Sequence, residues 1–600
     1  MKKWMAILVT LFVAMVVGWG ILTAVERSSL ETRARYHMYH LGALSIDRRD
    51  TAAAEIRKLG PAGVRILVAI YERQGSRWHR AWVSVYPQIP EVIRQILPAP
   101  ANLDLDRRQA LLALGAVGPL PTWAIPVLRH ALQDKDKEFR CLALMAIGGA
   151  GPAGEEAAAV VGELCLDADE EVRGQAVGAL LALGPAAQPA YPAILRALEH
   201  PDAVIRANAL SALEAFPRRI PDWTPHLTRA LEDSDPAVST AAFRLVGTLG
   251  HDAAPVSGAL VRLLMASEDP RSQTRAISAL QAIGPGAAAA IPALTGLLSQ
   301  GEPSVRARVP SALVGIDPTG ITVAPALTTA LGDSNAAVRQ AAIHALAGLR
   351  PRAPASIPVL RRLLSDPAPE VRLAAVWALI QHEIREPEIF VPLLLRDGTN
   401  SVIEEVSVVA DLLGRLGSGA KAAVPWLRSE LAKTNANCLF YAARSLWQIT
   451  GEAEPAVSVL PEFMPDRQFG FFPCEAARVL GQIGPAAQSA VPVLARRARC
   501  SQNEIQRFTR CPRGWEDNRY PSYFAAEAWW RIAHETNDVL PVIAEFALDK
   551  KSGYRPRALL LLAEFGPAAR GLLDRAAQDP SVEVRKAAQD ALARTRASVP

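Results

Sequence analysis

The chain has 600 residues, of which 50% are hydrophobic, so it has enough apolar side chains to bury a large core. Its 65 basic and 60 acidic residues leave a net charge of only +5. This balance argues against a dedicated nucleic-acid-binding protein, because such proteins concentrate basic charge strongly. Six cysteines are too few for a fold built on disulfides.

The chain begins with a segment that is long enough to cross a bilayer. After a short basic N-terminus at 1–3, the run Trp4–Val25 is apolar and uncharged. A signal peptide has a shorter apolar centre and a small-x-small cleavage site, and Leu22–Ala24 fits such a site poorly. We therefore expect an uncleaved signal anchor, followed by a juxtamembrane helix or linker at 26–44. A large C-terminal part is usually exported, so we expect a single-pass protein with its main part outside the cytoplasm.

One sequence unit then repeats along the chain. In the clearest unit, Pro152–Gly184, five apolar residues fall on one face of an α-helix, and a shorter helix precedes this one in each unit. The five are Val172, Ala176, Ala179, Leu180 and Leu183. Because one helical hairpin cannot bury both its faces, the units must stack into an all-α solenoid of about 14–15 units. A glycine or its substitute marks the end of each unit: Gly118, Gly151, Gly184, Pro217, Gly250, Gly284, Asp317 and Arg350.

The units change character along the chain. We expect N-terminal capping repeats with an insertion at 45–118, regular repeats at 119–383, degenerate aromatic-rich repeats at 384–534, and C-terminal repeats with a cap at 535–600. Trp78, Trp82 and Tyr86 lie in the first insertion. We interpret this insertion as an element that covers the open first hairpin, with a binding loop as the alternative.

Prolines recur in the first helix of the units, as at Pro126, Pro192 and Pro292. A proline at such a position either starts a helix or kinks it. A kink repeated in every unit would give the stack a steady curvature.

Asp and Arg recur six residues apart, with the Asp in the turn between the two helices and the Arg one turn into the second helix. Such pairs can meet within one unit or between units, and charge-assisted hydrogen bonds would then run along the stack. A general acid or base is not needed once per repeat, so we interpret these residues as structural. The members of this Asp–Arg ladder are Asp134/Arg140, Asp167/Arg173, Asp269/Arg275, Asp333/Arg339, Asp366/Arg372, Asp549/Arg555 and Asp579/Arg585.

The pattern G-P-A-A…A-x-P-x-L…L-x-D-x-x-x-x-V-R-x-x-A-x-x-A-L-x-x-I/L-G resembles HEAT repeats, specifically the short phycobilisome-lyase-like repeats of bacterial HEAT-repeat proteins. The resemblance covers residues 45–595. The period is shorter than the roughly 40–47 residues of ordinary HEAT units and equals the ankyrin period of about 33, but no unit has the ankyrin T-P-L-H motif. The resemblance implies protein binding rather than a chemical reaction.

A second insertion, Arg496–Tyr520, interrupts the degenerate repeats and is rich in arginine. Trp, Tyr and Arg dominate binding hot spots, so we predict a partner-binding surface here. The alternative is that the aromatic residues of this region fill a larger local core. Cys500 and Cys511 would close a short loop as a disulfide outside the cytoplasm, and their spacing matches no zinc signature. The candidate partner-binding residues are Arg507, Arg510, Arg513, Trp515, Arg519 and Tyr520.

The sequence has no motif of a hydrolase, P-loop, zinc protease or dinucleotide-binding protein, so we expect no catalysis, no cofactor and no metal site. The sequence therefore predicts a membrane-tethered scaffold that binds an unidentified protein or peptide. One alternative is a bilin-lyase-like or other cofactor-handling protein. A second alternative is a nucleic-acid-binding solenoid, which the charge balance and the anchor disfavour.

Overall fold

The computed structural model describes residues 30–41, 46–58, 60–73, 76–94, 100, 102–216, 223–349, 356–399, 403–433, 435–464, 472–499, 520–549 and 553–597. Every regular element in these ranges is an α-helix or a short 3₁₀-helix, which confirms the all-α fold class. The predicted anchor, Trp4–Val25, lies outside the described residues.

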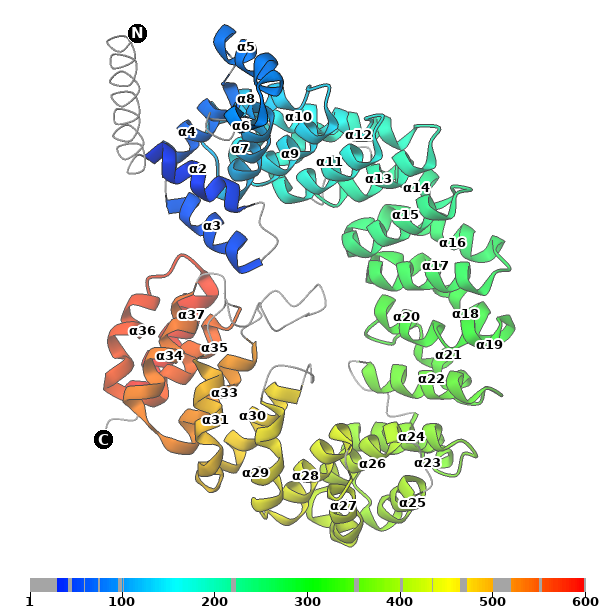
Figure 1. Cartoon of the computed structure of the whole chain (residues 1–600). Helices are drawn as coiled ribbons and strands as arrows, with labels where there is room; N and C mark the ends of the chain where they lie inside the picture. Colours follow the sequence, from blue (N-terminus) through cyan, green and yellow to red (C-terminus); the bar gives the residue numbers. More distant parts are fainter. Residues whose placement is uncertain are drawn as a thin grey trace, which may run out of the picture. The chain divides into compact units, whose positions relative to one another are not determined.

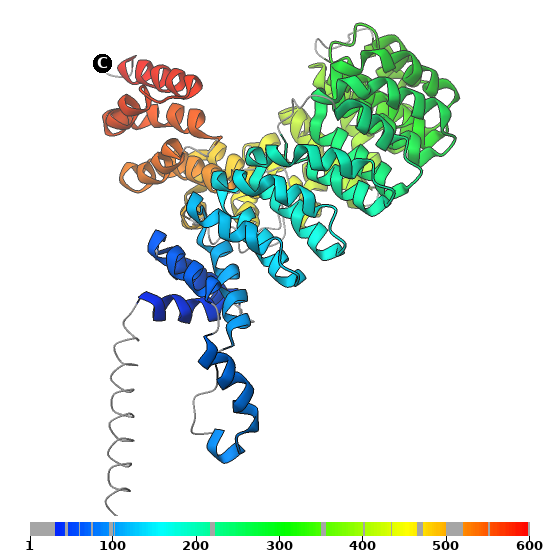
Figure 2. The same ribbon diagram turned by 90° about the horizontal axis from the view of Figure 1, so that it is seen from above.

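The chain forms two compact units, residues 1–326 and 327–600. Within each unit the chain alternates between a first and a second helix, and the second helices of successive repeats pack side by side (Figure 1). Figure 2 shows the cyan hairpins of the first unit stacked one beside the next. Each unit therefore has one layer of first helices and one layer of second helices.

In unit 1 the chain starts with α2 (Leu30–His40) and α3 (Ile46–Lys58), and the N-terminal insertion contains α5 (Arg77–Val85), η1 (Tyr86–Gln88) and α6 (Glu91–Arg94). The first helices are α4 (Gly60–Glu72), α8 (Ile125–Ala131), α10 (Glu155–Leu164), α12 (Tyr191–Leu198), α14 (Trp223–Leu231), α16 (Ser257–Ala266) and α18 (Ile291–Gln300). The second helices are α7 (Leu103–Val117), α9 (Lys137–Gly148), α11 (Glu170–Leu183), α13 (Ala203–Leu213), α15 (Pro236–Leu249), α17 (Pro270–Ile283), and the pair α19 (Pro303–Arg306) and α20 (Val309–Ile316). The 3₁₀-helices are η2 (Thr122–Ala124), η3 (Gly151–Gly154), η4 (Gly184–Ala190), η5 (Gly250–Val256) and η6 (Gly284–Ala290).

The boundary between the units falls in α21 (Ala324–Ala330). In unit 2 the first helices are α23 (Ile357–Leu363), α25 (Pro387–Thr399), α27 (Val424–Leu431), α29 (Glu454–Val459), α31 (Val491–Ala498), α34 (Thr536–Leu548) and α36 (Arg570–Ala576). The second helices are α22 (Ala336–Gly348), α24 (Pro369–Gln381), α26 (Ile403–Leu416), α28 (Ala436–Thr450), α30 (Phe472–Ile483), α33 (Tyr520–Ala533), α35 (Arg555–Leu562) and α37 (Val582–Ala597). The 3₁₀-helices are η8 (Gly417–Ala423), η9 (Leu460–Phe463), η10 (Gly484–Ala490) and η11 (Ala563–Ala569).

The apolar stripe predicted for Pro152–Gly184 is the buried face of α11. Val172, Ala176 and Leu180 have no exposed surface, and the other two members are also buried. The helix packs against α9 of the preceding repeat, α10 of its own repeat and α13 of the next. The stripe therefore joins three repeats, as a solenoid core requires.

The repeated glycine ends the second helix with a positive φ. Gly184 caps α11 with a φ of 53°, and its N–H donates to the carbonyl oxygen of Leu180. Glycine adopts this backbone region at no steric cost. Where Asp317 replaces the glycine, its φ is −124°, and the positive φ of 72° occurs at Gly320 instead.

Two glycine substitutions in α11 are expected to have opposite effects. Gly184→Ala should destabilise the repeat by about 1–2 kcal/mol, because φ is positive there. Gly178→Ala should stabilise it by about 0.5–1 kcal/mol, because this residue lies inside the helix and an added Cβ meets no atom within 4 Å. Hydrogen exchange of peptides that cover α11 measures both. Effects of the same sign would contradict this assignment of the cap.

Three of the recurring prolines start their first helices, whereas Pro392 in α25 and Pro541 in α34 lie inside theirs. Pro126, Pro192 and Pro292 each occupy the first turn, in α8, α12 and α18. A backbone N–H has no intrahelical partner at this position, so proline costs nothing there. Of the two alternatives, these three prolines start the helix.

Most described aromatic residues of the degenerate repeats fill the core. Tyr523, Phe524, Trp529 and Trp530 are all at least nine-tenths buried in one cluster with the helices around them. The indole N–H of Trp529 donates to Glu535, and that of Trp530 donates to Glu564 (2.9 and 3.0 Å). For these residues the core-filling alternative holds.

Candidate partner-binding surfaces

The ladder arginines bind the carboxylate of the following repeat. Arg140 donates to the backbone carbonyl of Asp134 in its own turn and to the carboxylate of Asp167 in the next repeat, both at 3.0 Å. The sequence allows pairing within one unit or between units. The side chains pair between units. The same arrangement joins Arg206 to Asp233, Arg339 to Asp366, Arg372 to Asp397 and Arg555 to Asp579.

The predicted pair Asp269/Arg275 is wrong. Asp269 caps α17 and accepts the backbone N–H of Ser272 (3.0 Å). The ladder position in this helix belongs to Gln273, which donates to the carbonyl of Ser267 (2.8 Å), while Arg275 is exposed. The six-residue spacing arises here because an Asp at the helix cap precedes an unrelated Arg.

The remaining ladder residues are partly engaged. Arg173 donates to the carbonyl of Asp167 (2.8 Å), but the next repeat has His200 where an aspartate would stand. The Asp333 carboxylate accepts the N–H of Asn335, the cap of α22 (2.8 Å). Asp549 is the C-terminal cap of α34, and Arg585 donates to the carbonyl of Asp579 (2.7 Å). The ladder of ion pairs is thus interrupted along the stack, where His200 replaces an aspartate and Gln273 replaces an arginine.

The ladder should make local stability sensitive to acid. Hydrogen bonds from Arg206 hold the pKa of Asp233 below its ordinary value. Burial alone would raise the pKa of Asp397, but hydrogen bonds from Arg372 and Arg396 outweigh burial and lower it. A carboxyl with a lowered folded pKa stabilises fully above its unfolded pKa, about 3.9, and this stabilisation is lost as pH falls through the folded value.

We therefore expect the opening free energy of α24 and α25 to stay constant between pH 7 and 5 and to fall below about pH 4. Hydrogen exchange at each pH measures it. Asp397→Asn should be less stable at pH 7 and should show a shallower decline. An equally steep decline in that variant would show that Asp397 is not responsible.

The predicted residues of the second insertion cannot be placed on a surface. Arg507, Arg510, Arg513, Trp515 and Arg519 lie outside the described residues, as do Cys500 and Cys511. Tyr520 is the first residue of α33. The partner-binding role and the disulfide therefore stay predictions.

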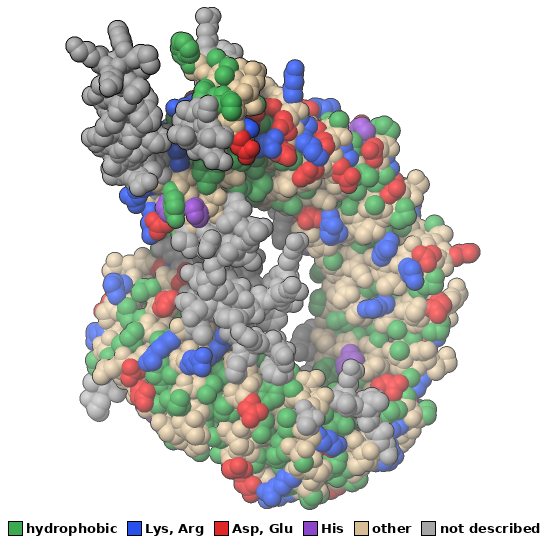
Figure 3. Space-filling model, in the orientation of Figure 1, with side chains coloured by type: hydrophobic (Ala, Val, Ile, Leu, Met, Phe, Trp, Pro, Cys, Tyr) green, Lys and Arg blue, Asp and Glu red, His purple; other side chains and the backbone are tan. Residues whose placement is uncertain are grey.

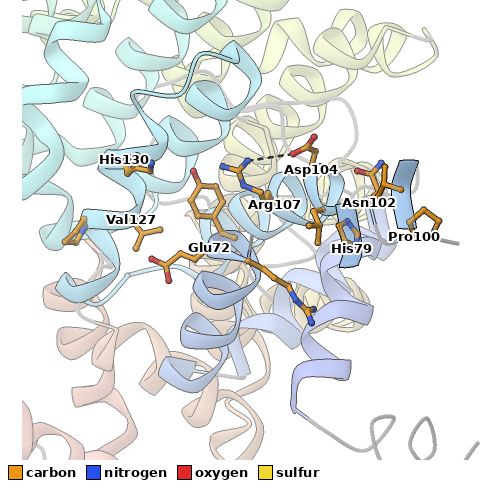
Figure 4. Close-up of a pocket in the computed structure, with 13 residues that line it drawn as sticks. Glu72, His79, Pro100, Asn102, Asp104, Arg107, Val127 and His130 are labelled. Carbon is orange, nitrogen blue, oxygen red and sulfur yellow. Dashed lines mark ion pairs between the residues drawn. The ribbon is translucent and has the colours of Figure 1, made fainter. Parts of the chain in front are cut away.

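A large polar cavity lies beside the N-terminal insertion. It has a volume of about 1120 Å³ and is lined by α4, α5, α7 and α8. The guanidinium of Arg107 lies over the rings of both Tyr71 and Phe139 (5.0 and 4.6 Å from their centroids) and 3.8 Å from Asp104. His130 lies on one side of Arg107, with His79 on the other (Figure 4).

The insertion forms a wall of this cavity and does not bury its first tryptophan. Trp78, on α5, is 86% exposed, so this side chain makes no apolar cover for the first hairpin. The cavity lining contains two acidic residues and two arginines, which compensate one another. The cavity therefore shows no preference for a ligand of either charge.

The exposed face of α22 and α24 differs from that of α11 and α17. We compare the positions five and nine residues after the helix cap. In α11 these positions hold Gly174 and Gly178, whereas in α17 they hold Thr274 and Ser278. In unit 2 the corresponding position of α22 holds His344, and that of α24 holds Trp377. Large ring side chains therefore replace small ones.

These rings line a groove that we call the aromatic groove. It has a volume of about 400 Å³ and crosses α22, α24, α26 and α28. The rings of His344 and Trp377 lie 4.9 Å apart, and Val408 is 46% exposed. The residues of the groove used below are His344, Glu370, Trp377, Val408, Asp411 and Tyr441.

Of the two carboxylates that line the aromatic groove, Asp411 forms ion pairs and Glu370 does not pair with any described residue. Asp411 forms ion pairs with Arg444 and with Arg415 (2.7 Å), and the Arg444 guanidinium also covers the ring of Tyr441 (4.9 Å). Desolvation by neighbouring groups lowers the pKa of His344 below its ordinary value. Glu370, in contrast, forms no ion pair with any residue that the structure describes.

The described cysteines and acidic residues give no sign of a reactive centre. Cys141, Cys165, Cys438 and Cys474 are buried free thiols, and burial raises the pKa of Cys165 and Cys474 to about 12. Within the described ranges, no three His, Cys, Asp or Glu side chains lie close enough to hold a metal ion.

One stretch of the described chain, Pro270–Gln300, has the length and apolar character of a membrane span. It consists of α17, η6 and α18, which belong to adjoining hairpins of the stack. Helices that pack into a protein core are equally apolar, so this composition is explained by the stack.

Stacked helical hairpins with two helix layers define the chain as an α-solenoid. A family model for HEAT repeats matches residues 91–181, 191–257, 224–314, 257–347 and 323–410, which together make up more than half of the chain. The chain therefore belongs to the HEAT-repeat family. No curated protein sequence matches it.

Solved structures of karyopherins have a similar fold. Kap121p is 13% identical, with a TM-score of 0.54 over 94% of this chain and 73% of that one. Kap95 in a Kap95:Nup1 complex is 13% identical, with a TM-score of 0.53 over 94% and 90%. Yeast importin-β (Kap95p) is 12% identical, with a TM-score of 0.51 over the same shares. At such identity the likeness shows the fold alone.

Proposed function

We propose that this protein is a membrane-tethered scaffold that binds another protein through the exposed face of its second helices. The observation that carries the proposal is the aromatic groove in unit 2, which is lined by His344, Trp377 and Tyr441. Tryptophan and tyrosine are enriched among residues that dominate binding energy. Kap95, which shares the fold, forms a complex with Nup1.

The proposal includes no catalysis and no nucleic-acid binding. The buried acidic residues of the ladder pair with arginines of neighbouring repeats, so they serve the stack. Acidic and basic side chains alternate over the visible described surface (Figure 3). A duplex-binding protein would present a continuous basic stripe.

The membrane part of the proposal rests on the apolar run Trp4–Val25, and we propose that the solenoid is extracytoplasmic. The full-length chain with a C-terminal alkaline phosphatase should stay with membranes in sodium carbonate and should be active. A cytoplasmic reporter that is active in place of the phosphatase would reverse the orientation. Release by carbonate would refute the anchor.

Site-specific photo-crosslinking tests the binding surface. A photoreactive amino acid at Val408, in the groove, should crosslink the full-length chain to another protein in cells. Ile389 is the matched control, because it is similarly exposed (49% against 46%) but lies on the first helix α25 of the same unit. Equal crosslinking at the two positions, or none at Val408, would refute the proposal.

A further inference from the structure

The length and volume of the aromatic groove indicate which conformation of a bound peptide fits it. Its lining comes from four successive second helices, so the groove runs across these helices and not along one of them. With packed helices about 8–10 Å apart, it is about 24–30 Å long. A helix of that length contains about 16–20 residues. As a cylinder about 10 Å in diameter, it has a volume of about 2,000 Å³. The groove offers about 400 Å³, a fifth of that volume.

An extended segment suits these dimensions. A strand rises about 3.3 Å per residue, so about eight residues span the groove, and alternate side chains face it. Only those alternate side chains need to enter, while the backbone lies across the open side. An extended peptide therefore matches the length of the groove with about eight residues, of which about four face the groove.

The walls of the groove show which side chains such a peptide needs. The ring of Trp377 and the exposed Val408 offer apolar surface on α24 and α26. The His344 ring packs against Trp377, and desolvation by its neighbours lowers its pKa. Apolar side chains, aromatic ones above all, gain the most contact here.

The charges of the groove show which sign the peptide needs. The Asp411 carboxylate is already paired with Arg444 and Arg415, and Arg372 on the neighbouring face of α24 is paired with Asp397 (2.7 Å). Glu370 remains, on the first turn of α24, without an ion pair among the described residues. Among the described residues, a carboxylate without a direct ion pair thus borders an aromatic surface, an arrangement that attracts a cationic side chain.

We infer that the aromatic groove binds an extended peptide segment that carries a lysine or arginine together with an apolar side chain. The cationic side chain pairs with Glu370, and the apolar side chain packs on Trp377 and Val408. This inference rests on the proposed function and names the class of partner for the same site. The bound segment is about eight residues long.

Fluorescence anisotropy with defined peptides tests the inference. The probe is a rhodamine-labelled octapeptide with blocked ends, in which lysine and phenylalanine alternate with serine, mixed with the purified full-length protein in detergent micelles. Replacing the lysines by glutamate should weaken binding at least tenfold. A version that contains α-aminoisobutyrate, and is therefore helical, should also bind at least tenfold more weakly.

Variants assign the interactions to residues. Glu370→Gln should remove the preference for lysine over norleucine, whereas Glu388→Gln, an exposed acidic residue on α25, should leave it unchanged. Trp377→Ala should weaken binding of every peptide, and Trp377→Phe should restore most of it. Circular dichroism of each variant shows whether the fold is kept.

Three results would overturn the inference. They are tighter binding of the glutamate peptide, tighter binding of the helical peptide, and no binding of any peptide. If the Val408 crosslink persists in the last case, the proposed scaffold function stands and only the peptide class is wrong. If the crosslink is also absent, both fail.

Discussion

Asp366→Ala is expected to lower the stability of its repeat by about 3–5 kcal/mol. Asp366 and Arg339 form a bidentate ion pair between two repeats, with distances of 2.8 and 2.7 Å. Their side chains are only 5% and 11% exposed. Removing the carboxylate leaves the guanidinium buried without its counterion, and this desolvated charge is the reason for the large effect.

A matched control separates burial from charge. Arg361 and Glu386 also pair between repeats, at 2.5 Å, but their side chains are 46% and 27% exposed. Arg361→Ala should cost less than about 1 kcal/mol, because water screens an exposed pair. Hydrogen exchange of peptides that cover α22 and α24 measures the opening free energy. Equal costs for the two variants would contradict the role of burial.

A double variant completes the test. Replacing Arg339 by methionine and Asp366 by leucine removes both charges and fills most of the space. We expect it to recover most of the stability that Asp366→Ala loses, since buried ion pairs are often replaceable by apolar side chains. If the double variant is as unstable as Asp366→Ala, the pair has a structural role beyond charge compensation.

Leu180→Ala should destabilise its repeat by about 2–5 kcal/mol. The side chain has no exposed surface and belongs to a helix that contacts three neighbouring helices. Truncation removes apolar contacts and leaves a cavity that a stack of rigid hairpins cannot close completely. The loss should spread to α9 and α13, because each repeat of a solenoid is stabilised by its neighbours.

Leu181→Ala is the control for this variant. Leu181 follows Leu180 in the same helix but is 43% exposed. Its truncation should change the stability by no more than about 0.5 kcal/mol. Hydrogen exchange of α9, α11 and α13 in both variants gives the comparison. Equal losses for Leu180 and Leu181 would show that the helix face is assigned wrongly.

The sequence by itself determined the fold, because the same physical pattern occurs in many copies. The stripe from Val172 to Leu183 specifies one buried helix face, and its repetition leaves stacking as the way to bury it. The recurring glycine likewise marks the end of each unit, and Gly184 ends α11 there with a positive φ. These are local properties, so they can be read one unit at a time.

Only the tertiary structure decided which residues from different units meet. Arg140 could pair with its own Asp134 or with the next aspartate, and stacking brings the carboxylate of Asp167 to its guanidinium. Aligning the units at their helix caps would have shown ring side chains at His344 and Trp377, but not that they share a groove. Residues about one repeat apart in sequence become neighbours only when second helices pack side by side, and that packing is a property of the stack.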